Sequence, residues 1–556
     1  MKHKIFLFFV MICVGNPFIR GQLSERIYMQ TDKQLYLAGE LLWLKLYTTD
    51  AEGKLLSLSK TGYVELIHDS TPEVQVKIDI RDGIGAGWME LPAMLPTGYY
   101  RMIAYTRYMR NDGANVFFEK RIAIVNPFSH NANLYAEDTG TPFSFIPIET
   151  NNAGLELSMD KSSYSKRDKG EIRIKGLPAE YISIGISIAG TDPVLAPNQS
   201  IHEWKKQLSG HSTPFESRRF LPEYEGAIID GVLIDLETGN PSGAPDVANL
   251  LSFPGDEIQL FAGKTDETGH VAFYTQCVTG KQELTTTAIA PSGKKYRIDI
   301  QSPYAIHTPT NLPILNPDST WLNYLKQRNL SVRVNHAFLA DSLSIIKEIT
   351  PCTYYRPYSR YKLDEYTRFP NMEDVFIEFI AFAGIRRTGG EGRRFNMIND
   401  MQTQFSTNIL VLFDNIPVTD HELIIQYNPL LIKTIDLHIG YYVFGGQLFD
   451  GIIAFNSYNN DFPGITFGEN TQIYDYEGTQ PYRYFYSPNY DETGISSRMP
   501  DFRHTLLWEP FIQSNRQNEL TIPFTTSDIT GSYVITIEGI GADGTVIHAK
   551  QTFEVK

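Results

Sequence analysis

The chain has 556 residues, of which 42% are hydrophobic and 20% charged, a composition typical of globular proteins and long enough for about three to five domains. Its 64 acidic residues outnumber its 49 basic residues and give a net charge of −15, which argues against a nucleic-acid partner because phosphate contacts need a basic surface. The content of 32 Tyr, 32 Phe, 31 Pro and 42 Gly favours short β-strands joined by turns.

Residues 1–21 are predicted to be a secretory signal peptide. Lys2 and Lys4 give a basic start, and the apolar run Ile5–Val14 that follows is too short to span a bilayer, which takes about 20 residues. No later segment has the apolar length of a membrane helix. We therefore expect an exported chain without a transmembrane segment, located in the periplasm or peripherally at the outer membrane.

Residues 23–128 are predicted to form a β-sandwich. Apolar and polar residues alternate along short segments that are separated by Gly, Pro and Asp turns, a spacing typical of about seven strands. Expected strands include Tyr63–Ile67, Val74–Ile80, Trp88–Leu91, Tyr99–Tyr105 and Phe117–Val125.

The pattern of this first unit is specific. Its diagnostic positions are Tyr28, Asp32, Tyr36, Gly39-Glu40, Trp43, Tyr63–Leu66, Leu91-Pro92, Thr97–Tyr100 and Ala104–Thr106. In these positions the unit resembles a macroglobulin domain of the alpha-2-macroglobulin family, and the resemblance implies an immunoglobulin-like sandwich.

The opening of the first unit recurs further along the chain. Asp32-Lys33-x-x-Tyr36 returns as Asp160-Lys161-x-x-Tyr164, and each copy precedes a Gly-Glu pair and an alternating strand. This repeat predicts a second macroglobulin-like sandwich over residues 153–223. Residues 129–152, which are rich in Asn, Thr and Pro, are predicted to link the two sandwiches.

Residues 224–300 are predicted to form a third β-domain. Two acidic turns, Asp235–Gly239 and Thr265–Gly269, lie between alternating segments. The unit resembles the small regulatory β-domain of carboxypeptidases.

The next segment, residues 301–349, is predicted to bridge two domains with a helix. Its best helical stretch is 318–348, where apolar residues fall near one face and polar residues lie between them. The residues of that face are Leu322, Leu325, Val332 and Ala337.

Residues 350–462 are predicted to form a small α+β domain. A buried strand, Ile409–Phe413, leads into a turn at Asp414-Asn415. A second strand, Ile432–Ile439, leads through a glycine-rich turn into a third, Gly451–Phe455. This order resembles the plug domain of TonB-dependent outer-membrane receptors.

The plug resemblance has both matches and departures. Asn415 and Ser457 stand where Gly and Thr are usual. In such receptors the plug fills a barrel of about 22 strands of about 10 residues each. Fewer than 100 residues follow Tyr458, so we expect a plug-like domain without a barrel of its own. The matching positions are Leu412, Asp414, Pro417, Ile432, Ile435, Gly440, Gly445, Gly451 and Ile452.

Residues 463–510 are predicted to be an aromatic linker, and residues 511–556 to supply the last sandwich strands, again in a pattern that resembles macroglobulin domains. The linker carries an aromatic run without strand alternation. It is a candidate contact surface for a partner, and the alternative is that it covers one of the chain's own sheets. The candidate residues are Tyr482, Tyr484, Phe485, Tyr486 and Tyr490.

No catalytic, cofactor-binding or metal-ligating residue is predicted, so the chain is not expected to be an enzyme. Gly539-x-Gly541-x-x-Gly544 matches the dinucleotide fingerprint, but a strand follows it where a helix is needed, so a hairpin turn is expected. His202-Glu203 and His421-Glu422 begin like a zinc motif, yet the position four residues after each His holds no ligand. Cys277 and Cys352 can form a disulfide in an exported protein or remain separate thiols.

These observations favour a non-enzymatic binding or assembly module at the bacterial outer membrane. Its plug-like and sandwich domains would dock on an outer-membrane barrel protein. Two alternatives remain open: an accessory of a TonB-dependent uptake system that binds a glycan or a peptide, and a macroglobulin-like protein that interacts with proteases. The second alternative is disfavoured because neither cysteine of the mature chain lies in the Cys-x-Glu-Gln run of a thioester.

Overall fold

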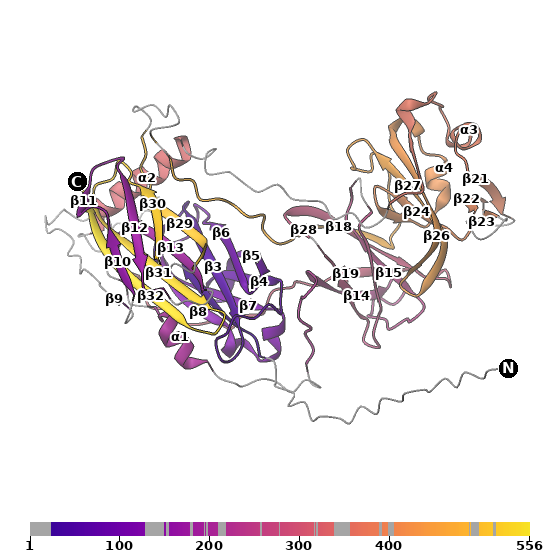
Figure 1. Ribbon diagram of the computed structural model, residues 1–556. Coiled ribbons are helices and arrows are strands. Elements are labelled where there is room, and N and C mark those ends of the chain that lie inside the picture. The colour runs from indigo at the N-terminus through magenta and orange to yellow at the C-terminus, as the bar shows by residue number, and fades with distance from the viewer. Residues whose placement is uncertain are drawn as a thin grey trace, which may run out of the picture.

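The structure is a computed structural model that is mainly β, as predicted, and Figure 1 shows it as two lobes. The predicted signal peptide, Cys277 and Cys352 lie outside the described residues. In the described part of the chain, no helix has the length and apolar character needed to cross a membrane. The described residues are 24–127, 150–151, 155–177, 182–193, 195, 198–208, 218–255, 258–276, 278–315, 317, 321–338, 356–388, 392–398, 405–488, 490, 500–514 and 519–556.

The first sandwich is a continuous stretch of chain, as expected. One sheet has the order β1-β3-β6 and the other β4-β7-β8-β2, and β5 pairs with both β4 and β6. Its core is aliphatic and aromatic because alternate residues of each strand, such as Leu42, Leu44 and Leu46, point inward. The strands are β1 Arg26–Thr31, β2 Leu35–Leu37, β3 Leu41–Thr49, β4 Thr61–His68, β5 Thr71–Arg81, β6 Ile84–Glu90, β7 Gly98–Thr106 and β8 Phe118–Val125.

The second sandwich is assembled from two distant segments. Its sheets have the orders β10-β12-β30 and β29-β13-β31-β32-β11. In Figure 1 the magenta strands of the first segment lie beside the yellow strands of the second. The strands are β9 Thr150–Asn151, β10 Glu156–Met159, β11 Ser163–Tyr164, β12 Lys169–Lys175, β13 Ile182–Gly190, β29 Thr505–Gln513, β30 Glu519–Thr525, β31 Gly531–Gly541 and β32 Val546–Val555.

This arrangement corrects the domain division read from the sequence. Residues 153–223 and 511–556 were expected to be separate units, but β13 pairs with β29 on one edge and with β31 on the other. Neither segment buries its apolar face alone, because Ile184 and Ile186 of the first segment share one core with Ile535 and Ile537 of the second. The glycine motif at 539–544 lies in the β31–β32 hairpin, as predicted.

The two sandwiches have the same topology. Read in chain order, the eight strands β1–β8 correspond one to one to β10–β13 and β29–β32, and the strand orders of both sheets then agree. The short second strand is parallel to the last strand in each case: β2 pairs with β8, and β11 pairs with β32. The repeat seen in the sequence is therefore a repeat of the whole sandwich.

The repeated motif makes the same hydrogen bonds twice. The Tyr36 hydroxyl donates to Asp32 Oδ1 at 2.7 Å, and the backbone N–H of Trp43 donates to the same oxygen at 3.1 Å. Likewise the Tyr164 hydroxyl (2.7 Å) and the N–H eleven residues after Asp160 (2.8 Å) both donate to Asp160 Oδ1. The aspartate thus ties the second strand to the third in each sandwich, which explains its fixed spacing from the tyrosine.

The sandwiches pack against each other through polar strand faces. Lys45 Nζ donates to Ser183 Oγ at 2.8 Å, and Gln30 Nε2 donates to the Gly185 carbonyl at 3.1 Å. Lys45 is fully buried, and this burial lowers its pKa well below the usual value. Residues of β13 therefore alternate between the apolar core of their own sandwich and this polar interface.

Between β13 and β29 the chain leaves to form the other lobe. It first makes helix α1 (Ile201–Gln207), which a Ser200–Glu203 capping box opens and which buries Trp204 against the first sandwich. It then forms two sheets with the orders β17-β14-β19 and β16-β15-β18-β28, for which we keep the name regulatory-like domain from the sequence resemblance. The strands are β14 Ile228–Asp235, β15 Ala248–Ser252, β16 Leu260–Gly263, β17 His270–Tyr274, β18 Lys281–Ile289, β19 Tyr296–Ile300 and β28 Thr471–Glu477.

Strand β28 corrects the expectation that residues 463–510 are an aromatic linker. It extends the regulatory-like domain by pairing with β18 along its whole length. Tyr474 and Tyr476 pack against the core of that domain, whereas the residues between and beside them face solvent. The residues that we call the plug-like domain, after the sequence resemblance alone, are thus inserted into the regulatory-like domain, which is itself inserted into the second sandwich.

Helix α2 (Leu322–Phe338) confirms the helix predicted in the bridging segment and packs on the first sandwich. Leu325 and Val332 are buried against β2 and β8 as expected, but Ala337 is exposed. The charged Arg328 is buried on the packed face instead. Periodicity predicted the two buried apolar residues on this face but not Arg328, because ion pairs with Glu40 and Asp192 hold the arginine there.

The plug-like domain contains the three predicted strands in one sheet with the order β20-β26-β27-β24-β25, and a second sheet with the order β21-β22-β23. Its strands are β20 Ser359–Lys362, β21 Ala383–Thr388, β22 Gly392–Ile398, β23 Phe405–Ser406, β24 Leu410–Phe413, β25 Ile416–Val418, β26 Ile432–Phe444 and β27 Gln447–Ser457. Its helices are α3 Met372–Glu378 and α4 His421–Ile425. Short 3-10 helices of the chain include Tyr108–Asn111, Ala114–Val116, Leu363–Glu365 and Pro429–Leu431.

Candidate functional site

The aromatic run expected to be a contact surface is divided among several environments. Tyr484 is 46% exposed, and the Tyr482 ring lies edge-on to it with centroids 4.8 Å apart. Phe485 lies edge-on to Trp43 of the first sandwich at 5.6 Å. Tyr486 is half-buried. These side chains do not form one continuous face, so much of the run packs on the chain itself.

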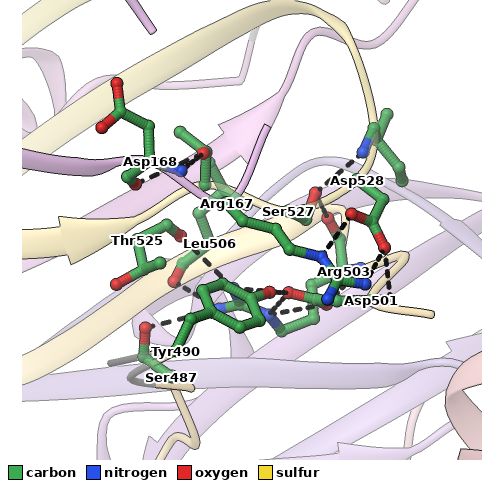
Figure 2. A network of polar contacts seen from close by, with 12 residues as sticks. Arg167, Asp168, Ser487, Tyr490, Asp501, Arg503, Leu506, Thr525, Ser527 and Asp528 are labelled. Atoms are coloured by element: carbon green, nitrogen blue, oxygen red, sulfur yellow. Dashed lines mark hydrogen bonds and ion pairs between the residues drawn. The ribbon is translucent and has the colours of Figure 1, made fainter. Parts of the chain in front are cut away.

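Tyr490, the last candidate of that run, belongs to a buried polar network that Figure 2 shows. Its hydroxyl donates to Asp501, which forms a bidentate pair with the buried Arg503 at 2.9 Å. Arg167 pairs with Asp528 at 2.6 Å, and Asp528 accepts a hydrogen bond from the Asp501 backbone. The network fixes the returning chain on the second sandwich, which is a structural role.

A cleft of about 620 Å3 lies where the first sandwich, helix α2 and the returning chain meet. Its walls are mostly apolar, and its charged residues come from both ends of the sequence. The lining residues are Lys33, Gly39, Glu40, Leu41, Trp43, Glu90, Leu91, Pro92, Ala93, Ser331, Val332, Arg483, Phe485, Arg503, His504 and Thr505.

Ion pairs neutralise the charges behind this cleft. The buried Arg328 of α2 contacts Glu40 at 2.6 Å and Asp192 at 3.0 Å, and Lys33 lies 3.5 Å from Glu40. Burial alone would raise the pKa of Glu40, but the two cations outweigh burial and lower it. Burial and the nearby Arg328 lower the pKa of His504, which lies 3.2 Å from Asp192. The floor of the cleft is thus polar without a large excess of charge.

The plug-like domain carries more than half of the exposed large hydrophobic side chains of the described residues. Of the 21 large hydrophobic side chains that are exposed, 11 lie between Tyr358 and Tyr458, so this domain is the best candidate for a contact with another molecule. They are Tyr358, Tyr366, Ile377, Phe382, Phe405, Leu430, Leu431, Tyr441, Val443, Leu448 and Tyr458.

The far end of the β26–β27 hairpin presents apolar side chains on both faces. Phe444 and Phe449 pack against the regulatory-like domain in a common core with Leu250. On the other face, Val443 is 66% exposed and lies directly opposite Leu448, which is 49% exposed. We call Tyr441, Val443 and Leu448 the hairpin patch.

The sequence held a signal for this patch that the prediction did not use. Tyr441–Phe444 before the Gly445-Gly446 turn and Leu448-Phe449 after it are consecutive apolar or aromatic residues, whereas a strand with one solvent face alternates apolar and polar residues. A hairpin that is apolar on both faces is stable in water only if both faces are packed against other groups. Here the regulatory-like domain covers the face of Phe444 and Phe449, and the face of Val443 and Leu448 is exposed.

The turn at Asp414-Asn415 has a structural role in this arrangement. Both residues have left-handed φ angles of 47° and 69°, the turn geometry that joins β24 to β25. Asp414 accepts hydrogen bonds from the backbone and hydroxyl of Ser457 at 2.6 and 2.8 Å. Asn415 Nδ2 donates to the carbonyls of Phe253 and Gly255. The two residues that depart from the receptor pattern, Asn415 and Ser457, thus both make fold-keeping contacts.

The described residues contain no group of three or more His, Cys, Asp or Glu side chains placed to hold a metal ion. His421 is buried and its pKa is lowered to about 3, because burial and the nearby Arg394 disfavour its charged form. Glu422 instead pairs with Arg393. The His421-Glu422 pair is therefore part of the packing of α4.

No family model matches this chain, and neither does any curated protein. Similar solved structures include Escherichia coli alpha-2-macroglobulin activated by porcine elastase (11% identity, TM-score 0.24, 96% of this chain and 44% of that one). They also include Salmonella alpha-2-macroglobulin reacted with methylamine (11%, 0.25, 96% and 39%) and the Escherichia coli adhesin FdeC (11%, 0.16, 53% and 66%). The chain spans less than half the length of these macroglobulins. The scores are low, so the sandwich assignment rests on the strand orders.

Proposed function

We propose that this chain is an exported, non-enzymatic binding or assembly module that docks on an outer-membrane barrel protein through its plug-like domain. The observation that carries the proposal is the concentration of exposed apolar side chains on that domain. Apolar groups that protrude from a soluble domain are costly to leave in water, and they mark sites of contact with proteins or membranes.

The plug-like domain is held firmly enough to act as a docking element. Leu410 and Leu412 of β24 share one apolar core with Leu250 and Leu260 of the regulatory-like domain. Asn415 adds hydrogen bonds across the same contact. The hairpin patch lies on the opposite face of β26–β27 and remains accessible.

The regulatory-like domain is in turn fixed to the first sandwich. Arg107 makes a bidentate pair with Asp230 at 2.7 and 2.9 Å, and Lys77 Nζ donates to the Glu477 carbonyl at 2.7 Å. The sandwiches would therefore serve as a platform from which the plug-like domain projects. The expected signal peptide and the resemblance to receptor plugs support the outer-membrane location.

The proposal is tested by recovering the tagged chain from detergent-extracted outer membranes and then measuring binding to the purified barrel protein so identified. A variant with Val443→Glu and Leu448→Glu places two charges in the hairpin patch. We expect this variant to lose the barrel protein, because burying unpaired carboxylates at a contact is strongly unfavourable.

The matched control is Ile306→Glu, which changes a 97% exposed isoleucine outside the plug-like domain and is expected to bind normally. Recovery of no barrel protein by the unaltered chain would defeat the proposal. If the patch variant binds the barrel protein as tightly as the unaltered chain does, the hairpin patch is not the contact surface.

A further inference from the structure

The cleft beside helix α2 has the size of a ligand site. Its volume of about 620 Å3 lies inside the range of roughly 300–1,000 Å3 that is typical of ligand pockets. It also lies at a junction of domains, where such pockets are common. A single side chain would fill only part of it, so the space suits a segment of several residues.

The two copies of the repeated motif show that the fold does not require apolar residues here. In the first sandwich the positions nine and eleven residues after the motif aspartate are Leu41 and Trp43. In the second sandwich the corresponding positions are Lys169 and Glu171, which is possible because that strand is open to solvent. The apolar wall is therefore particular to the first copy and its neighbours.

The chemistry of the wall favours an aromatic guest. Trp43 and Phe485 already form an edge-to-face pair, and Leu91, Pro92 and Val332 complete an apolar surface. Aromatic pairs prefer edge-to-face or offset-stacked geometry, and such pairs gain stability beyond the burial of their area. Trp43 is only 5% exposed, so it supports Phe485 from within the wall and offers no open ring face of the kind on which a sugar stacks.

The charges of the cleft disfavour a strongly charged guest. Glu40 is neutralised by Arg328 and Lys33, and Arg503 is neutralised by Asp501. Glu90 stands at the rim, with its side chain 73% exposed. A neutral side chain can thus enter while polar backbone groups stay at the rim.

From these observations we infer that the cleft binds an extended peptide segment and takes a neutral aromatic side chain against Phe485 and Pro92, two apolar wall residues that are accessible. The site lies in the lobe of the sandwiches, away from the hairpin patch. It does not depend on the proposed docking function, and either can fail without the other.

The test measures binding of two blocked tripeptides, acetyl-Ala-Phe-Ala-amide and acetyl-Ala-Ala-Ala-amide, to the purified chain by saturation-transfer NMR and calorimetry. The Phe peptide is expected to bind saturably with a dissociation constant of about 1 mM, and the Ala peptide about tenfold more weakly or not at all. Ala93→Trp fills the cleft from an exposed position and should abolish binding without disturbing the core. Phe485→Ala should weaken binding severalfold.

Phe511→Ala is the matched control, because Phe511 is a 45% exposed aromatic residue that packs on Tyr482 outside the cleft. This variant should bind the Phe peptide normally. Equal binding of both peptides, or unchanged binding by Ala93→Trp, would overturn the inference. Saturable binding of maltotriose that Ala93→Trp abolishes, with no binding of the Phe peptide, would also overturn it and assign the cleft to a glycan.

Discussion

The two sandwiches share one topology, yet one is continuous and the other is interrupted. In the first, the fourth and fifth strands are joined by a tight turn between His68 and Thr71. In the second, the same connection is replaced by residues 191–504. The backbone N–H of Gly190 donates to the His504 carbonyl at 2.9 Å, so the two ends of the insertion stay as close as the ends of a hairpin.

The connection between the fourth and fifth strands is therefore a position at which this fold accepts an insertion. A hairpin tip lies at the surface and carries few packing contacts, so a domain whose ends are close can replace it without opening the core. The insertion has an entropic cost, because strands β13 and β29 must pair across a long connection and closing a long loop lowers the entropy of the chain. Contacts of the first sandwich with the second, and with the inserted lobe, then become important for holding the assembly together.

The largest expected difference is between the two motif aspartates. Asp32 is buried, and besides its motif bonds it accepts a hydrogen bond from Thr505, the first residue after the insertion, and pairs with Lys33. Asp160 makes the same two motif bonds but is exposed. We expect Asp32→Ala to lower the free energy of unfolding by roughly 3–5 kcal/mol, because it breaks a buried ion pair and leaves Lys33 with only its longer contact to Glu40 at 3.5 Å.

Asp160→Ala should cost only about 1 kcal/mol, the loss of ordinary hydrogen bonds. Urea unfolding followed by tryptophan fluorescence measures both. Similar losses for the two variants would mean that burial and the added contacts at Asp32 contribute nothing.

The next largest expected effect is a pH dependence of stability that arises at the interface between the first sandwich and the inserted lobe. Glu223 is buried there, accepts a hydrogen bond from Tyr63, and faces Lys77, Arg107 and Tyr476. Burial raises the pKa of Glu223 to about 7. The folded chain therefore keeps a proton that the unfolded chain releases near pH 4.5, and stability must fall as the pH rises from about 5 to about 7.

The fall is expected to be roughly 1.4 kcal/mol for each pKa unit of displacement, and Glu223→Gln should remove it. Unfolding measured at several pH values checks the slope. Glu225→Gln, at an exposed neighbouring position, should keep the wild-type slope. A Glu223→Gln variant with the wild-type slope would show that other groups set the pH dependence.

A smaller effect is expected at the polar interface of the sandwiches. A Cβ atom on Gly185 would lie 2.1 Å from Gln30 Oε1 and 3.1 Å from Lys45 Cδ, and both side chains are buried. Gly185→Ala should therefore destabilise the chain by roughly 1–3 kcal/mol.

Gly98→Ala in the first sandwich is the control for this change. Its new Cβ would meet only the His68 ring, at 3.6 Å, and the change should be near neutral. The thermal midpoints of the two variants give the comparison. A neutral Gly185→Ala would mean that the sandwiches can separate slightly without loss.

The smallest effect is expected at the contact inside the inserted lobe. Asn415→Gly restores the residue usual in receptor plugs and suits a φ of 69°, but it removes the hydrogen bonds to Phe253 and Gly255. We expect a net loss of about 1 kcal/mol and faster proteolysis between the plug-like and regulatory-like domains. Asp82→Gly, in a turn with a similar φ of 51°, makes no such change and should be neutral or slightly stabilising. Proteolysis rates that match between the two variants would contradict this role of Asn415.

Local patterns in the sequence predicted much of the fold. Alternation and turn residues over short stretches were enough to predict the β class and most strands of the first sandwich. They also predicted the strands of the plug-like domain and the hairpin at 539–544, and the Asp-Lys-x-x-Tyr motif is visible as a repeat. The same logic missed β28, whose Tyr474 and Tyr476 alternate with acidic residues, because its surroundings resemble a linker.

The candidate sites were harder to predict. The aromatic run was found, but its residues face different neighbours, and the cleft draws its walls from positions as distant as Lys33 and Thr505. Arg328 is a polar residue on a helix, and only its pairs with Glu40 and Asp192 explain its burial.

The local elements and the repeated motif follow from neighbouring residues, because hydrogen bonds such as Tyr36 to Asp32 and Tyr164 to Asp160 join residues four positions apart. The completion of the second copy by the last strands of the chain depends on long-range packing instead. The pairing of β13 with β29 and β31 joins residues more than 300 positions apart, and strand pairing at such a distance leaves no periodic trace in either segment. Burial of the shared apolar core is what selects that pairing.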